Sequence, residues 1–174
     1  IWQFDHRYGD FRDRSDDSGN SQLPPVGDAD HADPSFVPLT RHWLTQGEVD
    51  ARLSGRWSRG WFLGFRDITN TTNERSMVIS AFPRTAVGHK LPLLLPSEAP
   101  ELLLAMLSSL CFDYVARQKV GGTSMGYFIL EQLPALSPRE FERRCPWEPD
   151  RTIGEWIRPR ILELVYTTWD MEPF

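Results

Sequence analysis

Two apolar runs, WFLGF at residues 61–65 and MVISAF at residues 77–82, most strongly constrain how this chain can fold. Each run has the length of one strand, and Pro83 stops the second because proline cannot donate to a sheet ladder. Between the runs lies a stretch of threonines, asparagines and charged residues. This order predicts two buried strands that hold a polar loop between them.

Shorter signals predict two neighbouring elements. Thr45 followed by Glu48 has the spacing of a capping box, so we expect a helix over residues 46–53. The stretch AVGHKLPLLLP after the second strand is consistent with a third strand. In it, Gly88 would form a bend and Pro92 would restrict the strand to a sheet edge or a bulge.

The clearest helical signal covers residues 97–119. Ser97 is a suitable N-cap, basic residues occupy the last turn, and Gly121 stands where a left-handed C-cap belongs. We expect one main helix whose inward face packs on the sheet. That face consists of Leu103, Met106, Leu107, Leu110, Tyr114 and Arg117.

These elements predict an α+β fold with one mixed, twisted sheet and one main packed helix. Residues 1–36 are expected to form an N-terminal segment with an acidic flexible linker, and residues 37–137 the core. Residues 128–138, FILEQLPALSP, would form a helical turn and a Pro-bounded strand. Residues 138–174 would form a C-terminal helical segment, helical around 161–166, that packs on the core or on a parent enzyme.

Length, charge and cysteine content narrow the function classes. A chain of 174 residues fits one domain of usual size. Its net charge of −5 argues against a nucleic-acid binder, but residues 41–90 carry a local charge of +4. Two distant cysteines, Cys111 in an apolar helical pattern and Cys145, indicate a reduced, cytoplasmic protein.

The apolar runs and the first residues of the chain indicate whether it has a membrane span or a signal peptide. No apolar run approaches the roughly 18 residues of a membrane span, so no membrane partner is expected. The first residues lack the basic start and the apolar stretch of a signal peptide. Because the chain opens without Met and with aromatic residues, we expect it to be a piece of a longer protein.

No catalytic or metal-binding pattern is visible. The four histidines and two cysteines lack the spacing of a zinc site. Neither a Gly-x-Ser-x-Gly nucleophile turn, a Walker loop nor a dinucleotide-binding glycine motif is present. The glycines of residues 121–126 follow a predicted helix rather than a strand, so they match a nucleotide loop weakly.

The polar loop has two interpretations. In the structural one, Arg66 pairs with Asp67 or Glu74 and closes a hairpin tip, and composition alone favours this interpretation. In the functional one, short polar side chains on the loop meet DNA bases while nearby arginines bind phosphates or guanine edges. The KVGGT stretch at 119–123 also has two interpretations: it could be a helix end or a phosphate-binding turn.

Five segments resemble one family along the whole chain. They are QFDHRYGDF (3–11), GFRDITNTTNER (64–75), AVGHKLPLL (86–94), DYVARQKVGGTSMGYFILEQLP (113–134) and LELVYTTWDMEPF (162–174). Together they resemble the C-terminal region of large adenine-specific DNA methyltransferases of fused type II restriction–modification and phage-defence systems. The VGGT…LEQLPAL part is also similar to the helix–turn–strand that closes the recognition domain of type I specificity subunits.

The resemblance implies a target-recognition domain that reads duplex DNA and positions an adenine for an N-terminal methyltransferase domain of the same polypeptide. It implies S-adenosylmethionine in the parent enzyme but no cofactor, metal or catalytic residue in this chain. The Asn- or Asp-Pro-Pro-Tyr tetrapeptide of the family is absent here. The DNA-binding residues it implies are Arg66, Thr69, Asn70, Thr71, Thr72, Asn73, Arg75, Arg84, His89, Lys90, Lys119, Gly121, Gly122 and Thr123.

A different class of function stays open. The chain could be a protein-interaction module that docks a nuclease or braces a methylase core. The contacts would then come from four aromatic residues, Trp2, Phe4, Trp156 and Trp169.

Overall fold

A three-stranded antiparallel sheet forms the centre of the computed structural model, which describes residues 1–12 and 23–174. The strands are β1 (Trp61–Phe65), β2 (Ile79–Pro83) and β3 (Leu93–Leu94). β1 lies between the other two, so Leu63 faces Ala81 on one side and Leu94 on the other. The two apolar runs therefore pair as predicted, and a short third strand follows the turn at Gly88, where the Leu91 amide bonds the Gly88 carbonyl.

The strand β1 is buried on both faces. Its apolar side chains, Trp61, Phe62, Leu63 and Phe65, are at most 2% exposed. Gly64 allows the close approach of the neighbouring strands, because a Cβ at this position would lie 2.9 Å from the Phe82 ring and 3.1 Å from the Pro92 carbonyl oxygen. The continuous apolar pattern thus reflects a strand covered from both sides.

Replacing Gly64 by valine is expected to lower the free energy of unfolding by about 1–3 kcal/mol, since the added atoms have no free space. Urea unfolding measures the change. Gly88→Ala is the matched control, because nothing lies within 4 Å of a Cβ there. Equal losses for the two variants would show that the close approach at Gly64 is unimportant.

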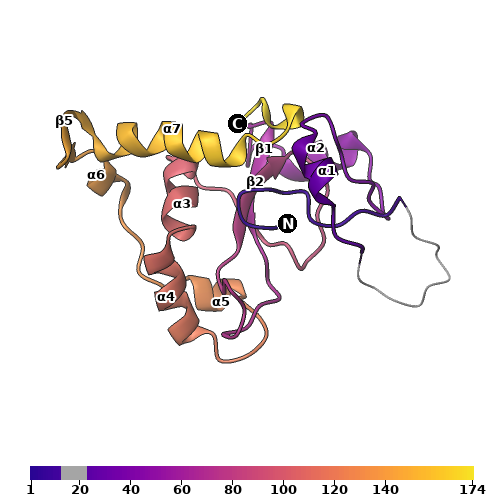
Figure 1. Cartoon of the computed structure of the whole chain (residues 1–174), viewed down its shortest axis with the longest axis horizontal. Coiled ribbons are helices and arrows are strands. Elements are labelled where there is room, and N and C mark those ends of the chain that lie inside the picture. The colour runs from indigo at the N-terminus through magenta and orange to yellow at the C-terminus, as the bar shows by residue number, and fades with distance from the viewer. Residues whose placement is uncertain (13–22) are drawn as a thin grey trace.

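Helices α3 (Pro100–Leu107) and α7 (Ile153–Val165) pack on each other, and α3 also contacts β2. Figure 1 shows α7 crossing the end of α3, with α4 (Leu110–Lys119) continuing beyond α3 and away from α7. Leu104 of α3 and Val165 of α7 are fully buried. None of the helices in the described part of the chain is long and apolar enough to cross a membrane.

The single main helix predicted from Ser97 to Lys119 is wrong. The chain forms two helices, α3 and α4, and the Ser109 hydroxyl caps the second by accepting the Phe112 amide at 3.1 Å. Ala99, in the left-handed region at φ +41°, precedes α3, so Ser97 is not its N-cap. Gly121, which follows the extended C-cap residue Val120, is not a left-handed cap either, because its φ is not positive.

The predicted inward face of this helix holds in α3, where Leu107 is buried in the core, but is wrong in α4. Leu110 is 72% and Tyr114 is 68% exposed, whereas Phe112 and Ala116 are buried. Since α4 restarts at Ser109, its faces do not continue those of α3. The prediction from hydrophobic periodicity treated residues 97–119 as one unbroken helix. It therefore assigned Leu110 and Tyr114 of α4 to the face that packs on the sheet, although both are exposed.

The remaining elements are short. They are α1 (Asp28–Ala32), α2 (Gln46–Leu53), α5 (Tyr127–Leu130), α6 (Pro138–Phe141), β4 (Arg144–Cys145), β5 (Glu148–Thr152) and the 3₁₀ helix η2 (Trp169–Met171). The predicted capping box of α2 is confirmed, with Thr45 and Glu48 bonded in both directions. Helices together with antiparallel sheets make the fold α+β.

Four further expectations need correction. Both described sheets are antiparallel rather than mixed. The strand expected after α5 is absent from the described residues, and an unpredicted β4–β5 hairpin follows instead. The C-terminal helix begins at Ile153, earlier than predicted, because Thr152 and Glu155 form a second capping box. In the predicted acidic linker, residues 13–22 lie outside the described residues, and α1 interrupts the remainder.

Both cysteines are free thiols. Cys111 is exposed on α4, contrary to its apolar sequence pattern, while Cys145 is buried within β4. The exposure of Cys111 follows from the same change of helical register.

Candidate nucleic-acid interface

The loop between β1 and β2 is closed by its own polar side chains. Thr69 is buried and donates its hydroxyl to the Ser76 carbonyl at 2.7 Å. Ser76, also buried, donates its hydroxyl to the Asn70 carbonyl at 3.0 Å. These bonds connect the two sides of the loop, so the predicted contact residue Thr69 has a structural role here.

Asn70 shapes the tip of the loop. Its side-chain oxygen accepts the backbone amides of Thr72 and Asn73 at 2.9 and 3.0 Å, and the Thr72 hydroxyl at 2.7 Å. An asparagine that caps the following amides in this way forms an Asx turn. The tip therefore presents Thr71 and Thr72 to solvent, while the Asn70 acceptor is already used.

Helix α4 supports the loop from one side. The Asp113 carboxylate is 5% exposed and accepts the backbone amides of Ser76 and Met77 at 2.8 and 2.7 Å. Arg117, one turn later, donates to the carbonyl oxygens of Thr71 and Glu74 at 2.7 and 2.9 Å. It also pairs with Asp113 at 3.0 Å, so one helix holds the tip and the C-terminal side of the loop.

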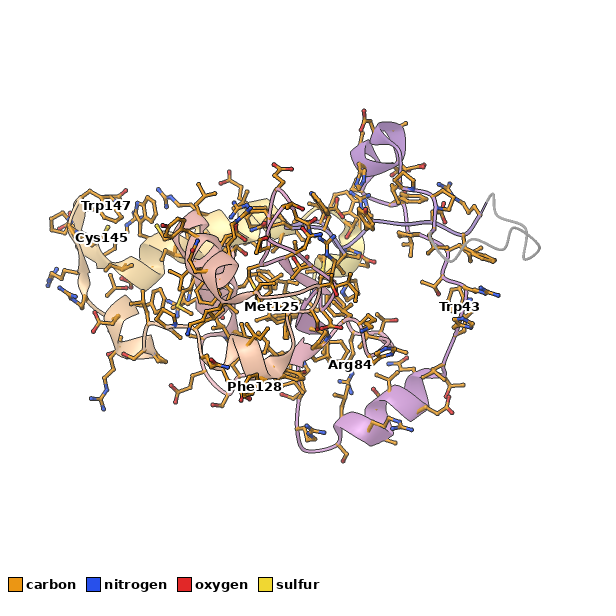
Figure 2. The ribbon with its side chains drawn as sticks, turned by 90° about the horizontal axis from the view of Figure 1, so that it is seen from below. Trp43, Arg84, Met125, Phe128, Cys145 and Trp147 are labelled. Carbon is orange, nitrogen blue, oxygen red and sulfur yellow. The ribbon has the colours of Figure 1, made fainter. Side chains whose placement is uncertain are left out.

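The segment after α4 supports the loop from another side. The Thr69 amide donates to the Thr123 carbonyl at 3.0 Å, and the Met125 amide donates to the Asp67 carbonyl at 2.7 Å. Met125 is fully buried and lies at the centre of the molecule in Figure 2. The structure thus brings the two predicted segments, the polar loop and the KVGGT turn, side by side.

Asp67 links these segments to the turn before β3. Its carboxylate pairs with Lys90 at 2.8 Å and accepts the Ser124 hydroxyl. The hydrogen bonds from Lys90 and Ser124 hold the pKa of Asp67 below its usual value, with a further contribution from His89. Within the described residues, no group of three His, Cys, Asp or Glu side chains gathers as a metal site.

Arg66 and Arg75 face away from this junction. Arg66 lies over the Trp2 ring at 5.4 Å. Arg75 lines a hollow of about 210 Å³ together with Trp2 and Phe4. No ion pair joins Arg66 to Asp67 or Glu74 in the described chain, so the predicted closure of the tip by Arg66 is wrong.

Arg84 lies at the opposite end of β2 from the loop. It pairs with Asp50 of α2 at 2.7 Å, and its amide donates to the Gly60 carbonyl. Figure 2 shows Arg84 on the side of the body that faces α2. Of the predicted contact residues, Arg84 is therefore the one farthest from the others along the hairpin.

Eight of the predicted residues remain exposed around the junction of the loop, the glycine turn and the turn before β3. They are Thr71, Thr72, His89, Lys90, Lys119 and Thr123, with the exposed backbone of Gly121 and Gly122 between the last two. Hydroxyl groups, backbone amides and cations of this kind bind phosphates and base edges. We call this set of residues the junction surface.

Sequence reasoning missed the residues that hold the junction together. Asp113 and Arg117 have the i, i+4 spacing of a helical ion pair, which is visible in the sequence. The hydrogen bonds from Asp113 and Arg117 to the loop could not be predicted from the sequence, because they join residues 36 to 46 positions apart. Ser124 gave no signal at all.

Comparisons of this chain with protein-family models, with curated proteins and with solved structures find no match.

Proposed function

We propose that this chain reads DNA sequence for an adenine-specific DNA methyltransferase of a restriction–modification or phage-defence system. It binds duplex DNA through the junction surface and positions the target adenine. A catalytic domain of the same polypeptide, which binds S-adenosylmethionine, transfers the methyl group. This role is the one implied by the resemblance of the five sequence segments to adenine-specific DNA methyltransferases. The proposal includes the fold of a target-recognition domain, which the same resemblance implies.

The observation that supports the proposal most is the rigid presentation of the loop tip. Asp113 and Arg117 hold the loop backbone from α4, while Thr123 holds it from the glycine turn. Thr71 and Thr72 are left exposed on this support. Base readout requires side chains held within a fraction of an ångström of the productive geometry, and such bracing provides that.

The charges of the junction surface favour phosphate contacts at its margins. Lys119 ends α4 and is exposed beside the glycine turn, whose backbone amides can also face a phosphate. Lys90 is partly neutralised by Asp67, so Lys119 is the stronger candidate for a free phosphate contact. Phosphate contacts set orientation, whereas the threonines would contact base edges.

Replacing Lys119 by glutamate is expected to weaken binding to a random-sequence DNA duplex on the order of tenfold at low salt. The slope of log affinity against log salt should also become shallower. Fluorescence anisotropy between roughly 50 and 200 mM salt measures both quantities. The charge change at one lysine acts on all sequences equally, because phosphates carry no sequence information.

Arg143→Glu is the matched control, since Arg143 carries the same charge and is exposed between α6 and β4. It changes the net charge equally but should leave affinity within about twofold at 0.15 M salt, where distant charges are screened. An equal loss of duplex affinity in the two variants would mean that only the net charge of the protein matters and that Lys119 makes no specific phosphate contact. Tight binding that does not depend on salt would contradict the electrostatic part of the proposal.

A protein-interaction role remains the second candidate because several large aromatic side chains are exposed. They include Trp43, Phe128, Trp147 and Trp169. Figure 2 shows Trp43 and Trp147 near opposite ends of the molecule, so they do not form one continuous patch. A docking function predicts that Lys119→Glu leaves duplex binding unchanged and that aromatic substitutions disrupt assembly with a partner.

A further inference from the structure

A groove of about 510 Å³ opens beside the junction surface, between the turn before β3 and the start of α5. Apolar atoms of Val87, Leu91 and Leu93 form its walls. Its volume lies within the range of roughly 300–1,000 Å³ that small-molecule sites occupy. The groove therefore has room for a ligand the size of one nucleotide.

One wall of the groove is an aromatic ring held in place. Tyr127 is 46% exposed, and its hydroxyl donates to the Leu93 carbonyl at 2.7 Å. Its ring also packs edge-to-face on the buried Phe65, with centroids 5.5 Å apart. A fixed and partly exposed ring is a suitable platform for stacking a planar heterocycle.

A buried carboxylate lines the polar part of the groove. Asp67 is 8% exposed, and Lys90 and Ser124 donate one hydrogen bond each to its two oxygens. An ionised carboxylate has about four acceptor positions, so about two remain for a ligand. These positions suit N–H donors, such as the amino and imino groups on the pairing edges of nucleobases.

A cation and an imidazole border the same groove. His89 lines it, and Lys90, which pairs with Asp67, is exposed at its edge. Aromatic and apolar walls, one buried acceptor and a nearby cation are together the features of a nucleotide site.

We propose that this groove binds one unstacked base of the DNA, which stacks on Tyr127 and donates its pairing-edge N–H groups to Asp67. Lys90, beside Asp67, would attract an adjoining phosphate. The inference rests on the proposed DNA-reading function. It adds that the chain recognises DNA in which one base is unpaired and unstacked. A paired base would not fit, since its donors are engaged with the opposite strand and its faces are stacked.

The test measures two probes by fluorescence anisotropy: a labelled single strand of twelve thymidines and a random-sequence duplex. Tyr127→Leu removes the ring and should weaken single-strand binding about 5- to 150-fold, the range reported for loss of one stacked base. Duplex binding should stay within about twofold. Trp147→Leu, the matched control, removes an exposed ring near one end of the molecule and should leave single-strand binding within about twofold of the original protein.

A second measurement does not depend on the folding of any variant. It uses the unchanged protein and a strand in which every thymine carries a methyl group on N3, so that the N–H donor to Asp67 is lost. Binding should fall on the order of tenfold, as expected for one buried hydrogen bond to a charged group.

Each outcome decides the proposal. Single-strand binding that survives Tyr127→Leu and N3 methylation overturns it, as does equal weakening of both probes by Tyr127→Leu. Absence of single-strand binding by the unchanged protein also overturns it. A protein that binds the single strand through Tyr127 but not the duplex would contradict the proposed duplex reading and support the base site, so the two failures are distinguishable.

Discussion

Replacing Asp113 by alanine is expected to lower the free energy of unfolding by about 3–5 kcal/mol, the usual cost of removing one partner of a buried charged network. Asp113 accepts the amides of Ser76 and Met77, two residues that are at most 1% exposed. Without the carboxylate, both amides lose their partner inside the protein, and each costs about 1–3 kcal/mol. Arg117 also loses its ion pair.

Urea unfolding of the variant measures this loss. Asp113→Asn keeps one acceptor oxygen and the side-chain volume, so it should cost clearly less than alanine. Glu140→Ala removes a surface partner of Arg143 and should change stability by less than about 1 kcal/mol. A loss from Asp113→Ala as small as that of Glu140→Ala would mean that water replaces the carboxylate at the loop.

The same substitution tests whether bracing of the loop matters for DNA binding. Amides of the loop should exchange hydrogen faster in Asp113→Ala while those of β1 stay protected, because only one side of the loop is released. Under the proposed function, duplex binding should weaken even at temperatures where the variant remains folded. Unchanged binding with faster exchange would show that a rigid tip is not required.

The elements that sequence predicted correctly depend on local chemistry. The Thr45–Glu48 capping box lies within one helical turn, and its two partners need nothing from the rest of the chain. The apolar runs of β1 and β2 were recognisable because both faces of these strands are buried. Local signals of this kind determine where a helix begins and which strands must be buried on both faces.

The errors arose where a local signal competed with a stronger one. Helical periodicity continued from α3 into α4, but Ser109 caps a new helix and moves the exposed face to Leu110 and Tyr114. A serine inside a helical pattern can be a neutral interior residue or a cap, and only packing decides.

The polar loop between the two strands was predictable from the sequence, but the contacts within the candidate site were not. The family resemblance implied that the loop and the glycine turn both face DNA, and only the structure shows that the Thr69 amide joins them by donating to the Thr123 carbonyl. Asp67 was assigned to Arg66, its immediate neighbour, but Lys90 binds it across the sheet. Pairing between distant residues depends on the tertiary fold, which spacing does not encode.

Replacing Arg7 by methionine is expected to lower the free energy of unfolding by about 3–5 kcal/mol as well. Arg7 is 1% exposed, and all of its guanidinium donors are used. They bond the two oxygens of Asp5 and three backbone carbonyls, those of Asp30, His31 and Asp33. Methionine fills a similar volume, so the loss would report the hydrogen bonds rather than a cavity.

Arg7→Lys should recover only part of the stability, because one ammonium cannot reproduce the planar fork of a guanidinium. Arg143→Met, at an exposed arginine, should change stability little. Thermal unfolding at neutral pH compares the three variants. Equal melting temperatures for Arg7→Met and Arg143→Met would contradict a structural role for the buried guanidinium.

The pH dependence of unfolding identifies the partner of Arg7. Burial alone would raise the pKa of Asp5, but the hydrogen bonds from Arg7 hold it below its ordinary value of 3.8. A depressed folded-state pKa stabilises the protein above the unfolded-state value, and this stability is lost as the pH falls through the folded-state pKa. The original protein should therefore lose stability relative to Arg7→Met when acidified below about pH 4. A stability difference that stays constant down to pH 2 would mean that the backbone carbonyls, rather than the Asp5 carboxylate, account for the effect of Arg7.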